Sequence, residues 1–185
     1  YFYGIRAVAS ASSTLDSMDA LFTPPRLKDR RIAELLEIAR RYCELIDTSG
    51  GGRPQWLREV AEVLPRLHAA MTSLHYDAPH AEHDHPVDLD ARFELYFRLR
   101  NLLGERDAYC LEFDSAQDGA DAMTGSLADD LTDIYCELKH GLRAFPAKPA
   151  RTLETWFLGY DCHWGQHLVD AQRHLATLAA ADRLG

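Results

Sequence analysis

Apolar residues recur every three or four positions along most of this chain, and this spacing constrains the fold more than any other feature. Side chains at that spacing lie on one face of an α-helix, where they can pack against a core. The clearest stripe lies between Leu27 and Ile46 and consists of Ile32, Leu35, Leu36, Ala39, Tyr42, Cys43 and Ile46. No segment alternates apolar and polar residues convincingly, as a half-buried strand would. The pattern therefore predicts an all-α protein with no sheet of more than two short strands.

Four further segments have the helical period, at residues 57–74, 90–103, 126–142 and 152–180, and a weaker one covers residues 13–22. Pro65 lies inside the first of them and predicts a kink or a fresh helix start, because proline lacks the amide N–H. Gly104 suits the end of the helix before it. Residues 105–125 are the least periodic. We expect a single compact bundle of about six helices with one irregular excursion at about 105–125.

The length of 185 residues suits one domain. We expect a single helical domain over residues 1–185, with residues 1–12 either disordered or added during cloning. The first residues lack the charged and apolar regions of a signal peptide, and the four cysteines contain no Cys-x-x-Cys pair. We therefore expect a cytoplasmic protein whose cysteines are small buried side chains.

The net charge of −9 limits the possible partners. Nucleic-acid binding needs clustered Lys and Arg, whereas the basic residues here are scattered among carboxylates. No apolar run approaches about 18 residues, the length at which a segment becomes a candidate membrane span. The sequence thus predicts neither a nucleic-acid partner nor a membrane-embedded segment.

Two motifs carry a resemblance to a known family. Residues 127–135 are Leu-Ala-Asp-Asp-Leu-Thr-Asp-Ile-Tyr, and residues 163–167 are His-Trp-Gly-Gln-His. This pair resembles a bacterial family catalogued as domain of unknown function 5063, and the resemblance extends over about residues 88–178. It implies a compact, mostly helical domain of about this length. It implies no reaction, so no catalytic residue is carried over from it.

The predicted helix at 126–142 carries a row of carboxylates. At about 100° per residue, Asp129, Asp133 and Glu137 share one side, roughly opposite the apolar stripe. They could hold a hard cation. The simpler interpretation is a solvated face, with acidic residues in the first turn favoured by the helix dipole. The candidate surface consists of Asp129, Asp130, Asp133 and Glu137, together with Trp164. The apolar stripe that contains Trp164 nevertheless predicts a buried core side chain for it.

The last predicted helix offers a sharper candidate. His163, His167 and Asp170 lie on one side of it, at the border of the apolar stripe. Two imidazoles one turn apart can chelate a transition metal, and a carboxylate from the 126–142 helix could join them. Trp164 stands where a zinc protease of this spacing has its Glu, so that general base is absent. The simpler alternative is a pair of histidines hydrogen-bonded to neighbouring helices.

A loop rich in histidine, with members His75, His80, His83 and His85, could take up metal weakly, but a polar linker is the simpler interpretation. No catalytic signature is complete. We therefore expect a non-catalytic interaction or regulatory domain that binds another protein and needs no cofactor. The alternative is a metal-binding protein or metal-dependent enzyme that uses a divalent transition metal.

Overall fold

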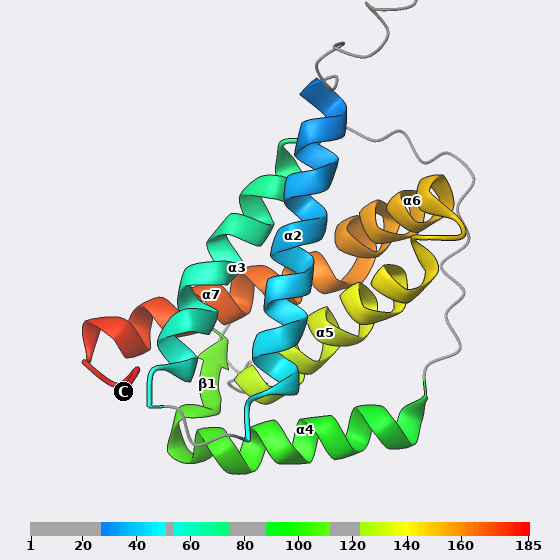
Figure 1. Ribbon diagram of the computed structural model, residues 1–185. Helices are drawn as coiled ribbons and strands as arrows, with labels where there is room; N and C mark the ends of the chain where they lie inside the picture. The colour runs from blue at the N-terminus through cyan, green and yellow to red at the C-terminus, as the bar shows by residue number, and fades with distance from the viewer. Residues whose placement is uncertain (1–26, 51–53, 75–87, 112–122) are drawn as a thin grey trace, which may run out of the picture.

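Helices account for just over half of the 185 residues in the computed structural model, which describes residues 27–50, 54–74, 88–111 and 123–185 (Figure 1). The α-helices of this part are α2 (Leu27–Asp47), α3 (Trp56–Thr72), α4 (Leu89–Leu103), α5 (Leu127–Ala144), α6 (Pro149–Gly159) and α7 (Gly165–Ala180). A 3-10 turn, η1 (Gly104–Arg106), precedes a hairpin of β1 (Ala108–Leu111) and β2 (Met123–Ser126). The predicted mostly helical fold is confirmed, and the excursion contains this small antiparallel hairpin.

Helix α5 is the centre of the packing, since it contacts α2, α4, α6 and α7. Its apolar stripe is fully buried at Leu127, Leu131, Ile134 and Leu138. The Tyr42 hydroxyl of α2 donates a hydrogen bond to the Leu131 carbonyl oxygen at 2.8 Å, which ties α2 to α5. Helices α2 and α3 lie side by side, and α4 runs along the lower edge of the view in Figure 1. A helix enclosed by four neighbours has little face left for solvent.

The hairpin leads directly into α5 and begins it. Ser126 is the N-cap residue, and its Oγ accepts from the Asp129 amide at 3.3 Å. Asp107, which precedes β1, accepts from the Ala128 amide at 2.8 Å through its Oδ1. Both contacts occupy backbone donors that have no partner inside the helix. Asp107 thus fixes the hairpin to the first turn of α5.

Two helix boundaries differ from the sequence-based expectation. Helix α3 continues through Pro65 from Trp56 to Thr72, so no fresh start occurs there. Instead of one helix over 152–180, α6 and α7 are joined by a π-helical turn, η2 (Tyr160–Trp164). The Gly165 amide donates to the Tyr160 carbonyl oxygen, five residues back, and a Cβ at Gly165 would collide with that oxygen. Glycine is therefore what allows this turn to close.

Several expectations concern residues outside the described part, namely residues 1–12, the weaker helix at 13–22 and the histidines His75, His80, His83 and His85. Gly104 ends α4 with a positive φ of 56°, as its position predicted. All four cysteines are free; Cys43 is buried, but Cys110 and Cys162 are exposed, against expectation. Among the described helices, none has the length and apolar character needed to cross a bilayer.

Candidate metal centre

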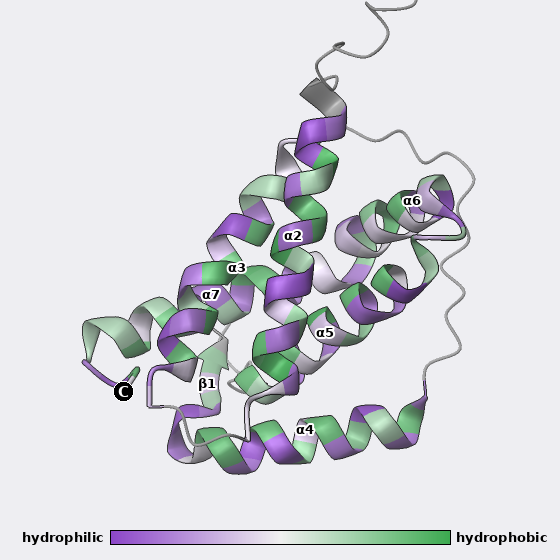
Figure 2. Ribbon diagram, in the orientation of Figure 1, coloured by the Kyte–Doolittle hydropathy of each residue, from purple (hydrophilic) through white to green (hydrophobic). Residues whose placement is uncertain are grey.

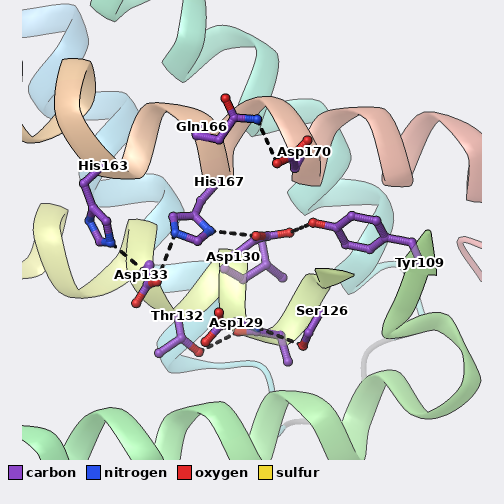
Figure 3. A network of polar contacts seen from close by, with 12 residues as sticks. Tyr109, Ser126, Asp129, Asp130, Thr132, Asp133, His163, Gln166, His167 and Asp170 are labelled. Carbon is purple, nitrogen blue, oxygen red and sulfur yellow. Dashed lines mark hydrogen bonds and ion pairs between the residues drawn. The ribbon is translucent and has the colours of Figure 1, made fainter. Parts of the chain in front are cut away.

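A cluster of two histidines and one aspartate lies where α5 meets η2 and the first turn of α7 (Figure 3). The Oδ2 atom of Asp133 is 3.3 Å from His167 Nε2 and 3.9 Å from His163 Nε2. One ligand atom from each of the three residues lies within 4.8 Å of the others. Two ligands about 2.0–2.1 Å from a tetrahedral ion would be about 3.4 Å apart, so this spacing is close to that of a metal centre.

A second carboxylate orients His167. Its Nδ1 contacts Asp130 Oδ1 at 2.8 Å, and the Tyr109 hydroxyl donates to Asp130 Oδ2 at 2.5 Å. Since the ionised carboxylate only accepts, the His167 proton belongs on Nδ1, and the Nε2 lone pair then faces Asp133 and His163. Carboxylate, imidazole and metal commonly form this chain in metalloproteins.

The environment shifts the proton affinities of these groups. The hydrogen bond with Asp130 raises the pKa of His167, since it stabilises the imidazolium. Burial raises the pKa of Asp130, although hydrogen bonds from His167 and Tyr109 oppose the rise. Burial, followed by the contact with Asp130, raises the pKa of Tyr109. A metal ion at His167 therefore has to compete with a proton that this network favours.

An arginine from α4 holds the other oxygen of Asp133. The Arg92 guanidinium donates to Asp133 Oδ1 from Nε at 2.8 Å and from Nη2 at 2.5 Å. The same Nη2 reaches Asp129 Oδ1 at 3.0 Å. Oδ1 of Asp133 is thus bound to α4, while Oδ2 is directed to the two histidines.

The remaining predicted residues lie around this cluster or apart from it. Glu137 Oε1 is 3.9 Å from His163 Nδ1. Asp170 accepts from Gln166 Nε2 at 2.9 Å and lies 3.7 Å from Arg173 Nη2, and it is not a member of the ligand group. The structure therefore brings His163 and His167 together with Asp133 of α5 rather than with Asp170.

The expectation of an exposed candidate surface is wrong for most of its members. Asp130, Asp133 and Glu137 are only 4%, 6% and 7% exposed. Trp164 is fully buried, as the apolar stripe that contains it predicted. The physical reason is that α4 covers the carboxylate row on one side and η2 with α7 covers it on the other. Asp129 alone keeps a partly exposed side chain, paired with Arg92.

Sequence reasoning did not single out Arg92 or Tyr109. Arg92 could have been found, since it stands three residues before Leu95 in the row Leu95, Leu99 and Leu103 that α4 buries. An arginine in such a row needs a buried acceptor. Tyr109 carried no comparable signal, because the hairpin that places it against Asp130 has no clear strand pattern.

We expect Gly165→Ala to destabilise the protein around the histidine–carboxylate cluster, because the new Cβ would force the Tyr160 carbonyl and the η2 turn to move. The expected loss of unfolding free energy is about 1–3 kcal/mol, the usual cost of forcing extra atoms into a packed site. Urea denaturation measures it, with Gly50→Ala as the matched control, since a Cβ at Gly50 has open space around it. Equal midpoints for the two variants would contradict the role given to Gly165.

The fold and the site define a class: a small helical domain with a histidine–carboxylate cluster at its central helix, in which Asp133 is buried, His167 half-buried and His163 exposed. Residues 27–181 match the model of the family described as domain of unknown function DUF5063, and the chain belongs to this family. The resemblance drawn from the two motifs is thereby confirmed.

A solved structure shares the fold. The crystal structure of protein BF1032 from Bacteroides fragilis, a structural genomics target, superposes with a TM-score of 0.65 at 20% sequence identity. The match covers 81% of this chain and 92% of that chain. A comparison with curated proteins gives no significant match. The shared fold at this identity carries no information on a reaction.

Proposed function

We propose that this protein binds one divalent transition-metal ion, such as Zn²⁺, through Asp133, His163 and His167. The observation that carries the proposal is the convergence of two imidazoles and one carboxylate oxygen within 4.8 Å of one another. Imidazole nitrogen and carboxylate oxygen are regular zinc ligands. Three protein ligands leave the fourth tetrahedral position for water, as in catalytic rather than purely structural zinc centres.

The residues around the cluster favour a bound cation over the alternative, in which the two histidines are held by hydrogen bonds only. Asp130 and Asp133 are buried carboxylates, and Arg92 supplies one positive charge to Asp133. Buried charge is costly unless it is compensated. Asp130 fixes the orientation of His167, and Arg92 fixes that of Asp133, so two of the three ligands are already aligned without the ion.

Zinc titration of protein without a His tag tests the proposal. Calorimetry at pH 7 should show that each protein molecule binds one zinc ion tightly. Asp133→Asn should weaken binding at least tenfold, because the amide lacks the carboxylate charge. Asp170→Asn is the matched control and should leave the affinity unchanged, since Asp170 is held by Gln166. A wild-type protein without a tight equivalent, or equal losses in the two variants, would overturn the assignment.

The affinity should also fall with pH in a defined direction. Protonated imidazole cannot bind metal, and the pKa of His167 is raised. Zinc binding should therefore weaken as the pH falls, and the loss should begin above pH 6.5, the usual pKa of histidine. Competition with a coloured chelator between pH 8 and pH 5 measures this. An affinity that stays constant across that range would contradict imidazole ligation.

The interaction or regulatory role favoured by the sequence, and the cytoplasmic location, stay predictions beside this proposal. A metal ion with an open position would serve either an enzyme or a binding protein. The proposal itself is limited to the ion and its three ligands.

A further inference from the structure

Helix α4 directs a row of large apolar side chains away from the core. Leu89, Phe93 and Phe97 recur every four residues and are 71%, 57% and 45% exposed. In the part of the chain that the structure describes, Val169 is the one other large hydrophobic residue with such exposure. The rings of Phe93 and Phe97 pack edge to face with centroids 5.0 Å apart, so these two side chains form a continuous patch.

The direction of this row is fixed by the opposite face of α4. Leu95, Leu99 and Leu103 are buried in the core, and Arg92 is bonded to Asp133 of α5. Figure 2 shows hydrophobic positions along the whole length of α4, at the outer edge of the molecule. A hollow of about 860 Å³ lies along the row, lined in part by Leu89, Phe93 and Phe97. Exposed apolar patches of this kind mark interaction sites.

The charges beside the row are divided between its two ends. Asp90 and Glu94 lie in the first half of α4 and Arg100 in the second half, whereas Arg98 donates to the Ile46 carbonyl oxygen of α2 and does not belong to this face. The Arg100 guanidinium bonds the Tyr96 hydroxyl at 3.3 Å, lies 3.9 Å from Asp107 Oδ2 and keeps more than half of its side chain exposed. The face is thus acidic at its beginning, aromatic in its middle and basic at its end.

We propose that this face of α4 joins two copies of the chain, with the two α4 helices antiparallel about a two-fold axis level with Leu95. This axis sets Phe93 opposite the second copy's Phe97. It brings Asp90 to the level of the second copy's Arg100, five residues on either side of the axis. Antiparallel helix dipoles add to this complementarity. A two-fold contact requires a surface that is complementary to itself, and the charge order of α4 meets this requirement.

Sedimentation velocity over a wide dilution series, with a chelator present, tests the contact independently of the proposed metal centre. We expect a dimer that dissociates on dilution, since one helix face makes a modest interface. The double change Phe93→Ser, Phe97→Ser should give a monomer at every concentration. Val169→Ser is the control: it removes a similarly exposed apolar residue from α7 and should leave the dimer unchanged. Far-ultraviolet circular dichroism verifies that each variant is folded.

Charge reversal tests the antiparallel register. Asp90→Arg alone and Arg100→Asp alone should each weaken the dimer at least tenfold, because each sets two like charges opposite each other. The urea midpoint of Arg100→Asp is compared with that of the wild type, since Arg100 also lies 3.9 Å from Asp107. The two changes combined should restore most of the affinity. A monomeric wild-type protein, a dimer that survives the double serine change, or a combined charge variant as weak as the single ones would overturn the proposal. A monomeric wild-type protein would mean that the exposed row of α4 contacts something other than a second copy.

Discussion

Replacing Trp164 by alanine should destabilise the protein by about 3–5 kcal/mol, the usual cost of removing a large aromatic side chain from a core. Trp164 is fully buried at the end of η2, and its ring packs edge to face on Tyr160 with centroids 5.0 Å apart. A domain of this size has a total stability of about 5–15 kcal/mol. Urea denaturation monitored by far-ultraviolet circular dichroism should show this loss of stability as a much lower midpoint.

Trp164→Phe provides the control for this change. The Trp164 Nε1 atom is buried without a hydrogen-bond partner among the described residues. Phenylalanine removes this unsatisfied donor and keeps most of the ring volume, so it should cost clearly less than alanine. An alanine variant with the wild-type midpoint would show that Trp164 has been misplaced in the core.

The double change His163→Ala, His167→Ala should abolish tight zinc binding and, with it, the stabilisation that the ion provides. A ligand at 100 to 1,000 times its dissociation constant stabilises the native state by about 2.7–4.1 kcal/mol. The wild-type melting temperature should therefore rise on addition of zinc, whereas that of the double variant should not. Differential scanning calorimetry with and without zinc measures both.

The histidine-rich loop needs its own control. Changing His80, His83 and His85 together to alanine should remove weak, non-stoichiometric uptake and keep the tight equivalent. If the double variant of His163 and His167 still binds zinc as well as the parent, these two residues are not the ligands. If the loop variant loses the tight equivalent, the ligands belong to the loop instead.

Much of the fold could be predicted because apolar periodicity reports directly which side of a helix is buried. The stripe of α2, from Leu35 to Ile46, and that of α5, from Leu127 to Leu138, are buried as predicted. The same reasoning failed for Asp130, Asp133 and Glu137, because a helical wheel describes one helix without its neighbours. Only tertiary packing shows that α4 and η2 cover the polar side of α5 and that Arg92 offsets its charge.

The candidate site, too, could be predicted where it depends on local spacing and could not where it depends on tertiary packing. His163 and His167 could be paired from their spacing of one turn, which is a local property of the chain. The choice between Asp133 and Asp170 could not be made, since Asp133 comes from a different helix and reaches the histidines only through the packing of α5 on α7. The π-helical form of η2 was equally hidden, although Gly165 was visible within the motif.

The order of the elements determines when a nascent chain could acquire the proposed ion. Arg92, Tyr109 and the two aspartates of α5 leave the ribosome first, and His163 follows Asp133 by about 30 residues, which is seconds at about 5–20 residues per second. Arg92, the ion-pair partner of Asp133 in the structure, has already been synthesised during that interval, so a partner for this carboxylate is present before the two histidines are. Loading would therefore be among the last events in the maturation of the protein, after the elements that supply the ligands have been synthesised.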